Sequence, residues 1–175
     1  MRFSAITVAA ALTFVPALAF AQNPVASAFR DTEKEAKTNL VAAVEDIPAA
    51  KYGYKPTKAQ MSIADIASHL AQGNDYLCAA ISGSKAPTRT KVTPASGKPA
   101  LVARLKETFA FCDQSLAGLD DSKLSEQMSF FGGPKMSRAA FILATASDWA
   151  DHYSQLANYM RLNGMLPPTA KKPSM

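Results

Sequence analysis

The chain contains two histidines, His69 and His152, and each falls on or beside the apolar stripe of a predicted helix. Asp148 precedes His152 by four residues, so its carboxylate projects from the same helical face, one turn away. If the two helices are neighbours, two imidazoles and a carboxylate converge, which is a donor set for Zn²⁺, Fe²⁺ or similar metals. A lone histidine on a helix is more often a hydrogen-bonded structural residue, and the Asp148 to His152 spacing alone is a weak signal.

Two other polar residues are candidates for catalytic roles near such a site. Glu33 interrupts the apolar stripe of the first predicted helix, where a carboxylate could accept a proton beside a pocket. More often such a residue lies at the end of a bundle and reaches solvent. Gln155 is close enough to His152 to orient a ligand or a bound water, and an interhelical hydrogen bond explains it equally well.

Four amphipathic segments must position these side chains. Apolar residues recur at helical spacing in each of them, and no segment alternates as a strand would. Ser62 with Asp65 predicts a capping box, Ser137 predicts a second N-terminal cap, and Gly83 and Gly164 mark helix ends. The predicted helices span residues 24–47, 62–82, 99–119 and 137–162.

The connections between the second and third helices and between the third and fourth are long. Residues 82–97 and 120–135 lack periodicity and exceed what a tight helical hairpin needs. Four helices in about 150 residues bury their stripes most simply against one another. We therefore predict an all-α fold, a four-helix bundle with long crossover connections.

The N-terminal residues predict export. Arg2 precedes an uncharged apolar run over residues 5–20, which ends in small residues around Ala21. This pattern predicts a signal peptide over residues 1–21, a single domain over residues 22–175, and a periplasmic or secreted location. No later stretch is apolar enough to span a membrane.

The net charge of +5 is modest, and the basic residues are scattered. Because no basic stripe carries interleaved aromatic residues, the sequence does not predict a nucleic-acid partner. A homodimer is compatible with a helical bundle, although the sequence identifies no face for it.

Two groups of segments resemble the DinB-like (DinB/YfiT) family. The first comprises YGYKP at 52–56, MSI at 61–63, SHL at 68–70 and LC at 77–78; the second comprises DHYSQL at 151–156, YMRLNG at 159–164 and PP at 167–168. The resemblance extends over essentially all of the chain beyond the leader. It implies a four-helix bundle and a metal site with one histidine from the second helix and two, four residues apart, from the last.

On that resemblance His69 and His152 match two of the three metal ligands, and Gln155 matches a frequent family position. Asp148 stands where the family usually has histidine, which replaces a nitrogen donor with a hard oxygen donor. The resemblance thus implies a divalent metal ion bound by His69, His152 and either Asp148 or water. It leaves the choice among Zn, Ni, Fe and Mn open.

The resemblance also implies a small-molecule substrate. Some family members resemble thiol-dependent transferases, so a low-molecular-weight thiol such as glutathione is one expected substrate, although small thiols are scarce in an oxidising compartment. Metal-assisted hydrolysis, with Glu33 or Asp148 as base, is chemically compatible as well. The alternative is a non-enzymatic bundle with a degenerate metal site that binds a small molecule or an envelope protein.

Cys78 and Cys112 are the only cysteines, in a protein predicted to reach an oxidising compartment. The family resemblance implies parallel second and third helices, which places the two cysteines at similar heights. A disulfide and two separate buried thiols then remain equally compatible with the sequence.

Overall fold

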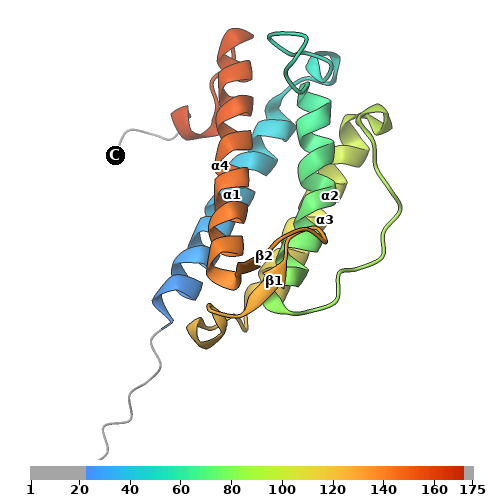
Figure 1. Cartoon of the computed structure of the whole chain (residues 1–175). Helices are drawn as coiled ribbons and strands as arrows, with labels where there is room; N and C mark the ends of the chain where they lie inside the picture. The colour runs from blue at the N-terminus through green and yellow to red at the C-terminus, as the bar shows by residue number, and fades with distance from the viewer. Residues whose placement is uncertain (1–22, 172–175) are drawn as a thin grey trace, which may run out of the picture.

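Four long helices and a short two-stranded sheet make up the computed structural model, which describes residues 23–171 (Figure 1). The predicted signal peptide, residues 1–21, lies outside the described residues. The four helices are α1 (Pro24–Asp46), α2 (Ile63–Ser82), α3 (Gly97–Leu116) and α4 (Arg138–Leu162), and the two short strands are β1 (Gln127–Ser129) and β2 (Lys135–Ser137). Short 3-10 turns lie at Ala49–Lys51, Pro94–Ser96, Asp121–Lys123 and Pro168–Ala170.

The ends of α2 and the start of α4 form at the predicted capping residues, whereas α3 begins two residues before and ends three residues before the predicted positions. The Ser62 hydroxyl accepts from the backbone N–H of Asp65 at 3.1 Å, and the Asp65 carboxylate accepts from the N–H of Ser62 at 2.9 Å. This capping box begins α2. Gly83 ends the helix with φ of 77°, a left-handed conformation that favours glycine. At the start of α4, the Ser137 hydroxyl accepts from the N–H of Ala140 at 3.2 Å.

The bundle contains the predicted crossover. α1 packs against α3 and α4, and α2 also packs against α3 and α4. Figure 1 shows α2 and α3 running in the same direction, with residues 83–96 returning along the length of the bundle. The end of α4 meets the start of α2, because the Tyr159 hydroxyl donates to the carbonyl of Met61 at 3.1 Å. α2 and α4 are therefore antiparallel neighbours, which brings their middle turns together.

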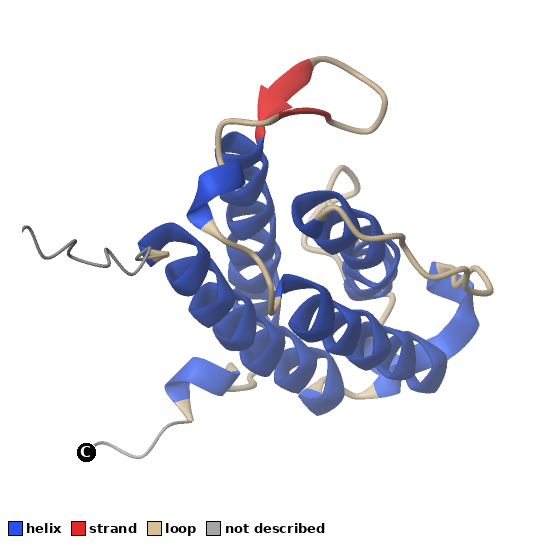
Figure 2. Ribbon diagram, turned by 90° about the horizontal axis from the view of Figure 1, so that it is seen from below, coloured by secondary structure: helices blue, strands red, loops and turns tan. Residues whose placement is uncertain are grey.

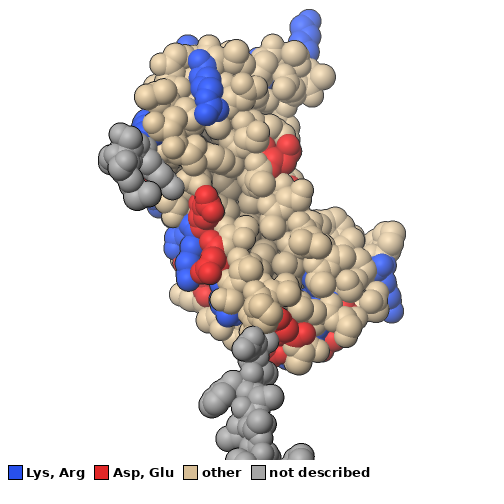
Figure 3. Space-filling model, turned by 90° about the vertical axis from the view of Figure 1, so that its left-hand side faces the viewer, with Lys and Arg blue, Asp and Glu red and all other residues tan. Residues whose placement is uncertain are grey.

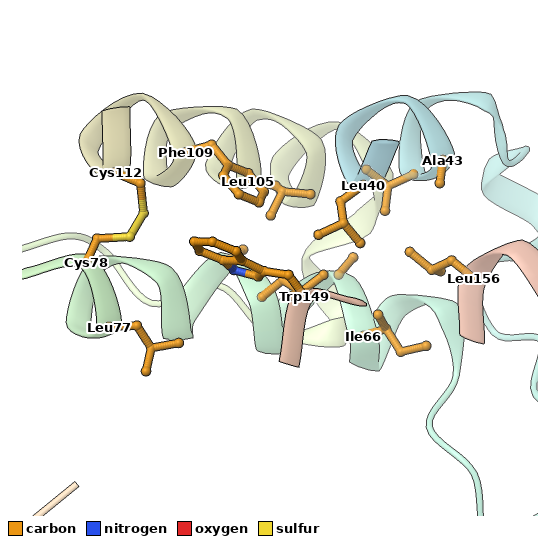
Figure 4. Packing of buried hydrophobic residues seen from close by; sticks show 14 of the residues in the cluster. Leu40, Ala43, Ile66, Leu77, Cys78, Leu105, Phe109, Cys112, Trp149 and Leu156 are labelled. Carbon is orange, nitrogen blue, oxygen red and sulfur yellow. A yellow bond between two sulfur atoms is a disulfide. The ribbon is translucent and has the colours of Figure 1, made fainter. Parts of the chain in front are cut away.

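Trp149 anchors the middle of α4 in the core. Its ring stacks on Phe29 of α1 with centroids 5.6 Å apart, and its Nε1 donates to Asn74 of α2 at 2.9 Å. Figure 4 shows the indole lying between α2 and α3, near Phe109. Since Trp149 follows Asp148 directly, this packing fixes the rotation of α4 about its axis and so the direction in which Asp148 points.

A disulfide joins Cys78 of α2 to Cys112 of α3, with the two Cα atoms 5.2 Å apart (Figure 4). The bond resolves the alternative that the sequence left open, because neither cysteine is free. It connects two parallel helices near their C-terminal ends and encloses the long segment between them.

Removing this disulfide is expected to lower the free energy of unfolding by about 4 kcal/mol, since it closes a loop of 34 residues in the unfolded chain. Urea denaturation of the oxidised protein and of the double variant Cys78→Ala/Cys112→Ala measures this loss. A reducing agent should destabilise the parent protein and leave the double variant unchanged. If the reducing agent lowered the free energy of unfolding equally in both proteins, the disulfide between Cys78 and Cys112 would be contradicted.

The β1–β2 hairpin was not predicted from the sequence pattern. β1 and β2 pair antiparallel, with Gln127 opposite Ser137 and Met128 opposite Met136. The expectation that no strand occurs is wrong for these six residues, because a strand of three residues is too short to produce a readable alternation. Figure 2 shows the hairpin at the edge of the helices. The all-α fold class is confirmed by the four helices, which form the core.

Among residues 23–171, no helix combines the length and the apolar character needed to cross a bilayer. On the face drawn in Figure 3, lysine and arginine side chains are separated by uncharged and acidic surface.

Candidate metal centre

α2 and α4 bring the three predicted ligands together. Nε2 of His69 lies 3.5 Å from Oδ1 of Asp148, and Nε2 of His152 lies 3.4 Å from the same oxygen. The two imidazole rings are 4.7 Å apart between centroids. One ligand atom from each of the three residues lies within 4.8 Å of the others. These residues form what we call the His–Asp–His cluster.

The distances fit a shared metal ion. Nitrogen and oxygen donors bound to zinc at about 2.0–2.1 Å with tetrahedral angles lie about 3.3 Å apart. The two contacts of Asp148 are already close to this value. All three ligand atoms lie within 4.8 Å of one another, so any remaining adjustment is small. His69 has the freedom to make it because 48% of its side chain is exposed. The cluster can therefore hold a divalent metal ion with two nitrogens and one oxygen.

Exposure is uneven across the cluster. Only 8% of the His152 side chain is exposed, compared with 33% for Asp148 and 48% for His69. The cluster thus opens to solvent on the α2 side, and its α4 side is set into the core. A fourth ligand would have to approach from the side of His69.

The charge of Asp148 dominates the electrostatics. Its hydrogen bonds with His152 and His69 hold the Asp148 pKa well below its usual range, although burial acts in the opposite direction. Contact with Asp148 raises the pKa of His69, against the effect of partial burial. A proton on His69 competes with a metal ion for the same nitrogen, so metal binding should weaken as the pH falls.

His152 lacks the support that a metal-ligating histidine usually has. Its Nδ1 is buried without a hydrogen-bond partner among the described residues. In most metal sites the second ring nitrogen donates to a carbonyl or carboxylate, which fixes the tautomer. Here the packing of α4 and the contact with Asp148 orient the ring instead.

Glu33 is buried at 2% exposure, so the alternative that it reaches solvent at the end of the bundle is wrong, and its neighbour is not the cluster. Its side chain faces Asp113 of α3, and Oε1 has no hydrogen-bond partner among the described residues. Burial first, and then the neighbouring Asp113 carboxylate, raise the pKa of Glu33 to about 8. The carboxyl group is therefore protonated at neutral pH and belongs to the packing of α1 against α3.

Gln155 also points elsewhere. Its side-chain amide donates to the carboxylate of Asp151, four residues earlier on α4, at 2.7 Å. The pair lies on the outer side of the helix, where Asp151 is exposed. The structure therefore does not bring Gln155 to the cluster.

Two aromatic residues beside the cluster were not predicted from the sequence. Phe130 and Phe131 of the hairpin turn line a cavity together with His69 and Asp148. The signal that could have found them is the sequence FFGGP at 130–134, in which two glycines and a proline follow a short strand. Such a turn connects two strands and places its aromatic residues together.

Comparisons with solved structures identify the same fold in three proteins. A DinB-like protein from Bacillus cereus has a TM-score of 0.67 and 15% identity, covering 81% of this chain and 95% of that one. A DinB-like protein from Bacillus subtilis has a TM-score of 0.61 and 18% identity, covering 86% of this chain and 100% of that one. A conserved protein from Enterococcus faecalis has a TM-score of 0.62 and 17% identity, covering 79% of this chain and 96% of that one. At these identities the likeness establishes the fold alone.

Comparison of the sequence with family models identifies the family, which the solved structures alone do not. No curated protein matches the chain. The family model of the DinB superfamily, however, matches residues 34–156, a range that contains His69, Asp148 and His152. The chain accordingly belongs to the DinB superfamily.

Proposed function

We propose that this chain is an exported protein that binds one divalent metal ion through His69, Asp148 and His152 and uses it to act on a small molecule. The observation that carries the proposal is the position of Asp148 Oδ1, which lies within 3.5 Å of an imidazole nitrogen from each of two helices. Those helices are fixed by independent contacts, since Trp149 packs beside the cluster and hydrogen-bonds to Asn74 of α2.

Each of the three residues would have a different role in the metal site. His152 supplies a buried nitrogen whose position the core determines, and Asp148 supplies the negative charge that partly neutralises a dication. His69, half exposed, leaves the approach for a substrate donor atom on its own side. A bound divalent metal would supply Lewis acidity and would lower the pKa of a thiol or water that coordinates it.

Thiol-dependent transfer is the reaction that we propose, on the strength of the family resemblance. In that reaction the cluster would hold the sulfur of a low-molecular-weight thiol as the nucleophilic thiolate. The disulfide between Cys78 and Cys112 supports the export part of the proposal, because such bonds persist in oxidising compartments.

Elemental analysis of the protein purified from the periplasm tests the metal part. We expect one divalent metal per chain in the parent protein and a large loss in His69→Ala and in His152→Ala. Gln155→Ala is the matched control, since Gln155 lies three residues from His152 on α4 and hydrogen-bonds to Asp151 instead. Its metal content should equal that of the parent.

A metal-free parent protein that regains no metal on titration would refute this function. That result would favour the alternative, a non-enzymatic bundle that binds a small molecule or an envelope protein. In such a bundle Asp148 only forms hydrogen bonds with the two histidines. If metal is present, added glutathione should perturb the visible spectrum of the cobalt-substituted protein. An unchanged spectrum would reject the thiol reaction and leave metal binding intact.

A further inference from the structure

A cavity of about 120 Å³ adjoins the His–Asp–His cluster. It lies between α2, α4 and the β1–β2 hairpin, and two of its lining residues, His69 and Asp148, belong to the cluster. The remaining walls come from Gly73, Leu77, Phe130, Phe131, Ala144 and Thr145. The cavity therefore has one polar end, at the cluster, and otherwise apolar walls.

The hydroxyl of Thr145 does not make this part of the cavity wall polar. Its hydroxyl donates to the carbonyl of Phe141, one turn earlier on α4, at 2.9 Å. The bond satisfies the hydroxyl within the helix and leaves the methyl group for contacts. Gly73 contributes only backbone, and a Cβ there would approach nothing closer than Leu77 Cδ1 at 3.9 Å. The space beside Gly73 is thus left open by the absence of a side chain.

Phe131 stands at the rim of the cavity and is held there. Its side chain is 60% exposed, and it has a positive φ of 49°, alone among the non-glycine residues of the described range. A bulky residue rarely adopts this conformation unless its surroundings impose it. Here the N–H of Phe131 donates to the Tyr76 hydroxyl at 2.8 Å, and the two rings stack with centroids 4.3 Å apart. Tyr76 of α2 therefore fixes an exposed aromatic ring beside the cluster.

The size of the cavity limits what can fill it. An apolar protein cavity of about 150 Å³ binds benzene. The cavity here is smaller, at about 120 Å³, so it admits at most one small ring or a short branched chain. A tripeptide thiol does not fit inside it and would reach the cluster from the exposed side of His69 instead. Because the polar end of the cavity is the cluster, a ligand that fills the cavity must combine a metal-binding head with a compact apolar group.

We propose that this cavity selects the substrate, and that the substrate is a small molecule with a metal-binding head joined to an apolar group no larger than one six-membered ring. The apolar group lies against Leu77, Phe130 and Phe131, and the head reaches the cluster at His69 and Asp148. This inference rests on the proposed metal function and adds the class of substrate.

Calorimetric titration of the zinc-loaded protein with two hydroxamates tests it. Acetohydroxamate and benzohydroxamate share the same metal-binding head, and only the second carries a ring. Burial of the ring is expected to make benzohydroxamate bind about tenfold more tightly or better. In Gly73→Leu, whose added side chain is expected to occupy the cavity, this difference should disappear, while the zinc content should equal that of the parent.

Two more variants separate filling of the cavity from changes in the helix. Gly73→Ala should keep most of the preference for benzohydroxamate, because its Cβ meets only Leu77 in ordinary contact. Phe131→Ala should reduce that preference several-fold without loss of zinc. Equal affinities of the two hydroxamates in the parent protein would overturn the inference while the metal site stands. A parent that retains no zinc and binds neither hydroxamate would instead refute the function on which the inference rests.

Discussion

Asp148→Ala is expected to weaken zinc binding by at least about 100-fold. Loss of a second-shell group alone costs about 10- to 100-fold in metal affinity, and Asp148 is placed as a direct ligand. It is also the residue whose oxygen contacts both imidazoles, and the source of negative charge in the cluster. Competition with a chromophoric chelator at fixed pH measures the affinities. The effect should exceed that of His69→Ala, because His69 is the most exposed of the three residues.

Two further variants at the same position identify what Asp148 contributes. Asp148→Asn keeps an oxygen donor and removes the charge, so it should bind zinc more weakly than the parent protein does. Asp148→His introduces the nitrogen donor that the family usually has, and should shift the preference from manganese towards zinc and nickel. If Asp148→Ala binds zinc as tightly as the parent does, then Asp148 is not a ligand and only the two histidines remain.

The part of the candidate site on α4 could be predicted from the sequence because its signals are local. The spacing of Asp148 and His152 fixes their common face, and the capping residues Ser62 and Ser137 set where α2 and α4 begin. What the spacing could not supply was the meeting of α2 with α4. That required the family resemblance, since the packing of helices depends on contacts between residues distant in the chain.

The features that were not predicted depend on such distant contacts. Phe131 acquires its position from Tyr76, a residue 55 positions earlier in the chain. The hairpin consists of strands too short for a readable pattern. The apolar stripe of the first helix suggests Glu33 as a proton acceptor near a pocket, but its neighbour is Asp113 of α3. No local pattern in the first helix indicates a carboxylate partner on another helix.

Glu33 is an unusual core residue. It is 2% exposed, and it lies beside the carboxylate of Asp113, which forms an ion pair with Lys37. Burial and this second carboxylate raise the pKa of Glu33 to about 8. Burial by itself would raise the pKa of Asp113. Hydrogen bonds with Lys37 and Glu33 outweigh burial and hold the pKa of Asp113 below its usual range. The pair therefore shares one proton at neutral pH, and that proton is on Glu33.

The direction of the pH effect follows from the two pKa values of Glu33. Below about pH 4.5 the group is protonated in both the folded and the unfolded chain. Between about 4.5 and 8 the unfolded chain releases the proton while the folded chain keeps it, so the unfolded state binds fewer protons and stability falls as the pH rises. Above about pH 8 both states are ionised, and this contribution becomes constant.

Glu33→Gln is therefore expected to stabilise the protein increasingly between pH 5 and pH 8. The amide keeps a donor for Asp113 and has no proton to lose, so the gain over the parent should reach up to about 4 kcal/mol near pH 8. Urea denaturation across this range measures it. Glu35→Gln, an exposed change two residues further along α1, is the matched control and should follow the parent. A constant difference between Glu33→Gln and the parent at every pH would mean that Glu33 is already ionised in the folded protein. Lys37 would then have to compensate the buried negative charge of Glu33, although it already forms an ion pair with Asp113.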